Sequence, residues 1–102
     1  MKNPARWLEI IEIRTGGNDS EKLERVLETL VESFNDSNDQ GKIKIYRRYA
    51  IHSDYSIHLL HKSNKPGTTG SELGQHLVAS LKEFGLLNHQ VWHDMKYNLK
   101  TV

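Results

Sequence analysis

The amino-acid sequence predicts an α+β domain in which two helices cover one face of a four-stranded antiparallel sheet. Two segments, residues 20–35 and 69–84, repeat apolar residues with the period of an amphipathic helix. The segments between and around them are short, rich in isoleucine, or alternate between apolar and polar residues, which is typical of strands. The predicted order is therefore β-α-β-β-α-β.

Length and composition set the limits within which this fold must be built. The chain has 102 residues, so we expect one domain over residues 1–102. The absence of cysteine excludes disulfides, thiolate metal sites and a cysteine nucleophile. With 14 basic and 13 acidic residues, the net charge of +1 is far from the basic excess typical of nucleic-acid-binding domains.

The first predicted strand and helix cover residues 7–14 and 20–35. Thr15, Gly16 and Gly17 follow the strand as a turn, and Asp19 or Ser20 can cap the helix. One stripe of the helix is apolar, so we expect this stripe to face the sheet. It consists of Leu23, Val26, Leu27, Leu30, Val31 and Phe34.

A hairpin is predicted over residues 42–62, with a break at residues 52–54. Its first arm alternates Ile43 and Ile45 with lysines, which is the pattern of a half-buried strand. The second arm becomes apolar on both sides, which indicates a more central position in the sheet. Residues 63–67 form a predicted loop.

The second predicted helix, residues 69–84, has a capping-box pattern in Thr69 and Glu72. Gly85 is positioned to end it in a left-handed conformation. A last strand is predicted over residues 88–99. Two helices packed on one face of such a sheet make the ferredoxin-like arrangement.

Strand alternation divides the sheet residues between two faces. We expect one set beneath the helices, namely Ile11, Ile13, Ile43, Ile45, Ile57 and Leu59. The other face then carries Leu8, Ile10, Glu12, Tyr46, Arg48, His58 and Leu60. This second set is too apolar to remain exposed in a soluble monomer, and the chain has no third helix to cover it. We therefore predict a homodimer that pairs these faces by two-fold symmetry.

The candidate site lies on that second face. Glu12 and His58 fall on neighbouring strands, where a carboxylate beside an imidazole can act in acid–base catalysis. The alternative is a buried, charge-assisted hydrogen bond without catalysis. Tyr46, Arg48 and Trp92 are the predicted ligand-binding residues, although tryptophan is also a common core or interface anchor.

Other chemistries receive less support from the sequence. The six histidines show no spacing typical of a metal site, since His58 and His61 should point to opposite faces of a strand. We predict no metal and no cofactor. The hairpin also has a basic arm that could bind RNA, formed by Lys42, Lys44, Arg47 and Arg48 with Tyr46 and Tyr49 interleaved. The following strand lacks the aromatic signature of RNA-recognition domains, and lysines on an edge strand also prevent aggregation. No membrane-spanning stretch and no leader peptide are visible, which favours a cytoplasmic location.

The chain resembles the small antibiotic-biosynthesis-monooxygenase-like members of the dimeric α/β-barrel superfamily over residues 6–97. The resemblance rests on the element order and on three segments, residues 8–11, 54–59 and 81–92. It implies a homodimer whose two sheets face one another and enclose a cavity on each side. Our leading hypothesis is that this dimer binds an apolar or aromatic small molecule, with cofactor-independent monooxygenase activity as its enzymatic form. Some members oxidise polycyclic aromatic substrates with O₂ and no cofactor, and others degrade haem. The alternatives are a non-enzymatic dimerisation or regulatory ligand-binding module and, third, an RNA-binding module.

Overall fold

The computed structural model describes residues 7–16, 20–37, 41–62 and 69–95. Its elements are β1 (Trp7–Thr15), α1 (Ser20–Ser37), β2 (Gly41–Arg47), β3 (Asp54–His61), α2 (Glu72–Leu81), a 3₁₀ turn η1 (Lys82–Phe84) and β4 (Gly85–His93). The predicted loop at residues 63–67 lies outside the described residues.

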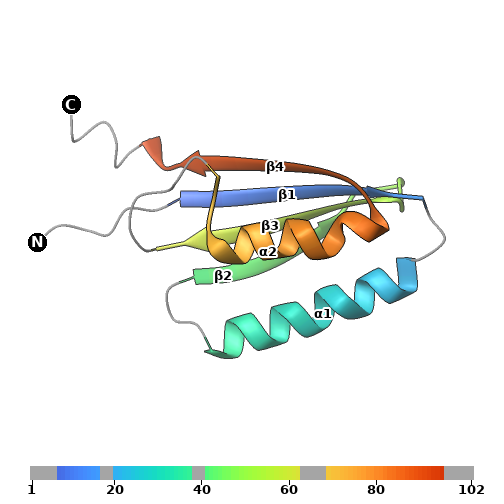
Figure 1. Ribbon diagram of the computed structural model, residues 1–102, viewed down its shortest axis with the longest axis horizontal. Helices are drawn as coiled ribbons and strands as arrows, with labels where there is room; N and C mark the ends of the chain where they lie inside the picture. Colours follow the sequence, from blue (N-terminus) through green and yellow to red (C-terminus); the bar gives the residue numbers. More distant parts are fainter. Residues whose placement is uncertain (1–6, 17–19, 38–40, 63–68, 96–102) are drawn as a thin grey trace, which may run out of the picture.

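The four strands form one antiparallel sheet in the order β2-β3-β1-β4. Both helices lie on the same side of it (Figure 1). The predicted α+β class, with its antiparallel sheet and two helices, is thereby confirmed, and the arrangement is compatible with a ferredoxin-like fold. The second hairpin arm, β3, is central and β2 is an edge strand, as its lysines indicated.

The predicted division of the strands into two faces is confirmed. Residues of β1 alternate between buried and less buried positions from Trp7 to Thr15. Ile11, Ile57 and Leu59 have no exposed surface, and they join Leu23 and Leu27 of α1 and Leu77 and Leu81 of α2 in one core. The opposite face, which we call the open face, has no described helix upon it.

All four boundaries of α2 and β4 differ from the sequence-based expectation of residues 69–84 and 88–99. The cap of α2 is Ser71, whose Oγ accepts a hydrogen bond from the Gly74 amide at 2.9 Å, whereas Thr69 bonds to the side chain of Gln75. Gly85 has φ 164, which is extended backbone and not a left-handed stop. It is the first residue of β4, which therefore starts before residue 88 and ends at His93.

A close backbone approach, rather than a helix stop, accounts for Gly85. Gly85 pairs with Thr15 at the end of the ladder between β1 and β4. A Cβ atom at this position would overlap the carbonyl oxygen of Arg14. Glycine is therefore required here because any side chain would separate the strands.

Candidate functional site

The open face has an apolar end. The sheet register aligns Leu60, Leu8 and Trp92 in one row across β3, β1 and β4. Trp92 is 55% exposed and Leu60 is 39% exposed, and Trp92 Nε1 donates to Gln90 Oε1 at 3.0 Å. These three residues line a shallow depression of about 310 Å³. The predicted ligand-binding residue Trp92 is thus placed on the surface and not in the core.

The middle of the open face is polar. Tyr46, Ser56, Glu12 and Asn88 form the corresponding row from β2 to β4. Asn88 Nδ2 donates a hydrogen bond to Glu12 Oε1 at 3.3 Å. Tyr46 is 48% exposed. The face therefore combines an apolar end with a centre that can hydrogen-bond a bound molecule.

His58 is the imidazole of this polar centre. Its Nε2 lies 3.0 Å from Ser56 Oγ, and its ring is 4.8 Å from the ring of Tyr46, tilted by 56°. Burial lowers the pKa of His58, and the charge of Glu12 opposes that effect only in part. His58 is therefore predominantly neutral at pH 7 and able to accept a proton.

Glu12 and His58 share the open face, but they do not form the hydrogen-bonded pair that the sequence suggested. Glu12 is in register with Ser56, so His58 lies diagonally from it, opposite Ile10. Among the described residues, Glu12 bonds to Asn88 and His58 bonds to Ser56. Their interaction is through the electric field alone.

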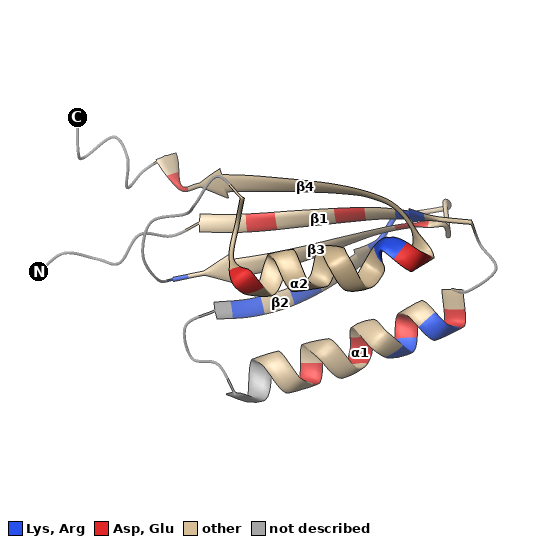
Figure 2. Ribbon diagram, in the orientation of Figure 1, with Lys and Arg blue, Asp and Glu red and all other residues tan. Residues whose placement is uncertain are grey.

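Arg48, the remaining predicted ligand-binding residue, lies just after β2 and contacts Asp54, with 3.3 Å between Nη1 and Oδ2. It lines a groove of about 510 Å³ at the end of the open face opposite Trp92. Figure 2 shows that the charged residues of β2 are basic, whereas α1 carries both acidic and basic residues.

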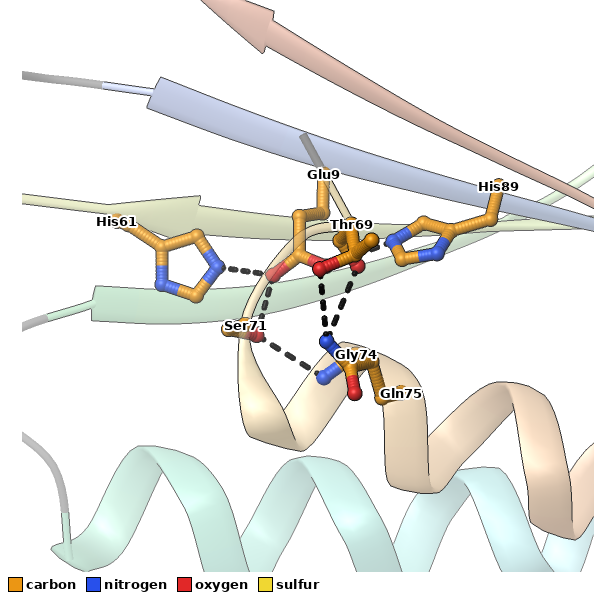
Figure 3. Close-up of polar contacts among 7 residues, drawn as sticks. All are labelled: Glu9, His61, Thr69, Ser71, Gly74, Gln75 and His89. Carbon is orange, nitrogen blue, oxygen red and sulfur yellow. Dashed lines mark hydrogen bonds and ion pairs between the residues drawn. The ribbon is translucent and has the colours of Figure 1, made fainter. Parts of the chain in front are cut away.

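A second polar cluster lies on the helix side of the sheet, where sequence reasoning expected only core. Glu9 has no exposed surface. His61 Nε2 lies 2.6 Å from its Oε1, and His89 Nε2 lies 2.7 Å from its Oε2 (Figure 3). Ser71, the cap of α2, also donates to Oε1. We call these four residues the Glu9 cluster.

The Glu9 cluster holds an ionised carboxylate inside the protein. Burial is the strongest single influence and raises the pKa of Glu9, but the hydrogen bonds from His61, Ser71 and His89 together outweigh it and lower the pKa to about 2. Both imidazoles must then donate through Nε2–H. The His61 ring has a further contact, because it stacks on Trp7 with 4.0 Å between the ring centroids.

The surroundings of Glu9 leave no room for a substrate. A Cβ atom on Gly74 of α2 would overlap Glu9 Oε2, so the helix backbone lies directly against the carboxylate. The Glu9 cluster therefore holds the start of α2 against the sheet, through the hydrogen bond from Ser71 to Glu9. A signal for it was present in the sequence, because Glu9 alternates with Ile11 and Ile13 on the core face.

Residues 7–16, 20–37, 41–62 and 69–95 contain no cluster of three or more histidines or carboxylates able to hold a metal ion. None of the helices in these ranges has the length and apolar character needed to cross a bilayer.

Comparison with known proteins returned no match among protein-family models, curated proteins or solved structures. The resemblance to the dimeric α/β-barrel superfamily therefore stays a prediction. A functional assignment must be built from the geometry of the open face.

Proposed function

We propose that the protein is a homodimer whose two open faces pack together and enclose an apolar or aromatic small molecule, as in a dimeric α/β barrel built from ferredoxin-like protomers. The observation that carries the proposal is the composition of the open face. It exposes Leu60, Trp92 and Tyr46 by 39%, 55% and 48%, on a sheet whose two described helices lie on the other side.

The distribution of these residues supports enclosure of a ligand rather than dry packing alone. The apolar row of Leu8, Leu60 and Trp92 can pack against its two-fold copy. The polar row that contains Glu12 and Ser56 would lose water on association, so it needs hydrogen-bonding partners there. A bound molecule supplies such partners while its apolar part fills the space between the sheets.

In the enzymatic form of this proposal, His58 is the base. A neutral imidazole beside the Tyr46 ring can take a proton from an acidic hydroxyl of a bound aromatic molecule. Glu12 would stabilise the resulting imidazolium through its charge. This proton removal is the role that we assign to His58 if the protein acts as a cofactor-independent monooxygenase. The non-enzymatic form of the proposal needs only the enclosure.

Dimerisation is tested by light scattering during gel filtration between about 1 and 100 µM, because paired open faces should bury more than the ~1,000 Å² typical of a specific interface. We expect twice the chain mass of 11.8 kDa. Leu60→Glu should give the monomer mass, since it places charge in the apolar row. Contrary to the expectation that it faces the sheet, Val26 of α1 is 41% exposed, close to the 39% of Leu60, so Val26→Glu is the matched control. A wild-type mass of 11.8 kDa throughout overturns the proposal.

Tryptophan fluorescence identifies the face that is used. The chain has two tryptophans, of which Trp7 is 6% exposed and Trp92 is 55% exposed. In Trp7→Phe, the emission of Trp92 should shift to shorter wavelength and resist acrylamide quenching as the dimer forms. In Trp92→Phe, the emission of buried Trp7 should not change with concentration. A dimer that leaves Trp92 fully quenchable would place the interface elsewhere.

A further inference from the structure

Two arginines converge on one carboxylate at the end of the open face opposite Trp92. Arg14 binds Asp54 with 3.1 Å between Nε and Oδ1 and 3.2 Å between Nη2 and Oδ2. Arg48 Nη1 lies 3.3 Å from the same Oδ2. Ser53 Oγ donates to Oδ1 at 3.1 Å. We call Arg14, Arg48 and Asp54 the arginine cluster.

The backbone holds the arginine cluster in place. Arg14 and Asp54 are directly opposite in the ladder between β1 and β3. The amide of Arg48 donates to the Asp54 carbonyl at 2.9 Å, and the amide of Thr15 donates to the Ser53 carbonyl at 2.8 Å. The turn between β2 and β3 includes Ala50 at φ 63, a left-handed conformation that a residue with a Cβ adopts only when its surroundings impose it. The two guanidinium groups are therefore positioned before any ligand binds.

The charges of the cluster do not balance. The hydrogen bond from Arg14 is the largest influence that lowers the pKa of Asp54, so this carboxyl is ionised at neutral pH. One negative charge thus faces two positive ones. Among the described residues, Arg48 contacts Asp54 through Nη1 only, and its side chain is 58% exposed. Guanidinium N–H groups therefore remain directed at solvent, where they can bind a further anion.

The groove beside the cluster determines what kind of anion fits. Its volume is about 510 Å³, which is within the range of small-molecule sites. Tyr46 and Leu86, exposed by 48% and 79%, supply apolar walls. Asn88 and Ser56 supply hydrogen-bonding groups, and Glu12 places a negative charge at the other side of the groove, which disfavours a ligand with several negative charges.

We propose that the ligand of this protein is an aromatic monocarboxylate, with its carboxylate on the arginine cluster and its ring between Tyr46 and Leu86. This inference rests on the proposed function, because pairing of the open faces would cover the groove and close it around the ring. A free inorganic anion would leave the apolar walls unused, whereas a neutral aromatic molecule would leave the guanidinium groups without a new acceptor.

Calorimetric titration with three probes tests the ligand class. We expect 2-naphthoate to bind at least about tenfold more tightly than 2-naphthylmethanol, which has the same ring system without charge, and more tightly than inorganic phosphate. Arg48→Gln should remove the preference for naphthoate over the alcohol. Arg25→Gln is the matched control, since Arg25 is an exposed arginine of α1 whose contact is with Glu21, and it should keep the preference.

The outcomes separate this inference from the proposed function. Equal binding of naphthoate and the alcohol, or a preference that survives in Arg48→Gln, overturns the carboxylate assignment and leaves the enclosed dimer standing. Phosphate binding as tight as naphthoate binding, or displacement of naphthoate by a short oligouridylate, overturns it in favour of a phosphate or nucleic-acid site. Failure of every probe to bind overturns it as well, and the light-scattering mass then decides whether the proposed dimer falls with it.

Discussion

Replacement of Glu9 by glutamine tests the Glu9 cluster directly. The substitution keeps the shape of the side chain but removes its charge and turns one acceptor oxygen into an NH₂ donor. Three donors surround the carboxylate, from His61, Ser71 and His89. A neutral amide cannot accept from all of them, so at least one imidazole must change tautomer or lose its bond.

The magnitude follows from the pKa of Glu9. Its decrease from 4.5 to about 2 corresponds to about 3 kcal/mol of folding free energy, at about 1.4 kcal/mol for each pH unit. Because the pKa is lowered in the folded state, this stabilisation is present above pH 4.5 and is lost as the pH falls toward 2. We therefore expect Glu9→Gln to lower the free energy of unfolding by about 2–4 kcal/mol at pH 7.

The assay is urea denaturation followed by circular dichroism at one protein concentration, repeated between pH 7 and pH 2.5. The difference between wild type and Glu9→Gln should shrink as the pH decreases, since protonated Glu9 resembles glutamine. Glu12→Gln, an exposed carboxylate on the same strand, is the control and should change stability by no more than about 0.5 kcal/mol at pH 7. A Glu9→Gln difference below that value, or one that stays constant with pH, would refute the reasoning.

Three further predictions concern other parts of the fold. Leu27→Ala, at a position 2% exposed, should cost about 2–5 kcal/mol in urea denaturation, whereas Leu30→Ala, at a partly buried position, should cost less. Gly85→Ala should destabilise the protein by more than about 1 kcal/mol, because its Cβ meets the Arg14 carbonyl, whereas Gly16→Ala, which meets nothing, should not. Glu12→Gln should lower the pKa of His58 further in an NMR titration, since it removes the charge that opposes the effect of burial; an unchanged titration would show that the two groups do not interact.

Local patterns were sufficient to predict the elements and the two faces of the sheet. Leu23 and Leu27 recur with the helical period, and Ile11 and Ile13 recur with the strand period, so their buried sides could be read from neighbours in the chain. The boundaries of β4 were missed because Gly85 was interpreted as a helix stop. Its actual role depends on the Arg14 carbonyl, a contact with no local signature.

The Glu9 cluster could not be assembled from local patterns. Its hydrogen bonds join Glu9 to residues 52, 62 and 80 positions away. Alternation indicates that Glu9 is buried, but it does not identify the groups that satisfy the carboxylate. The arginine cluster has the same limitation, since Arg14 and Asp54 are 40 positions apart and meet only through the register of β1 and β3.

The position of Glu9 between two imidazoles also bears on how the chain avoids incorrect strand pairings. Glu9 lies opposite Leu59 on β3 and Val91 on β4, and its partners His61 and His89 are diagonal neighbours on the two sides. A slip of either neighbouring strand by two residues would keep apolar side chains on the core face. Hydrophobic burial alone therefore distinguishes the slipped register only weakly from the native one. A slip of β3 that places Ile57 opposite Glu9 would move His61 away from the carboxylate and leave a buried charge with too few donors. Glu9 thus disfavours misaligned sheets, and through Ser71 the same carboxylate also holds the start of α2 against the aligned strands.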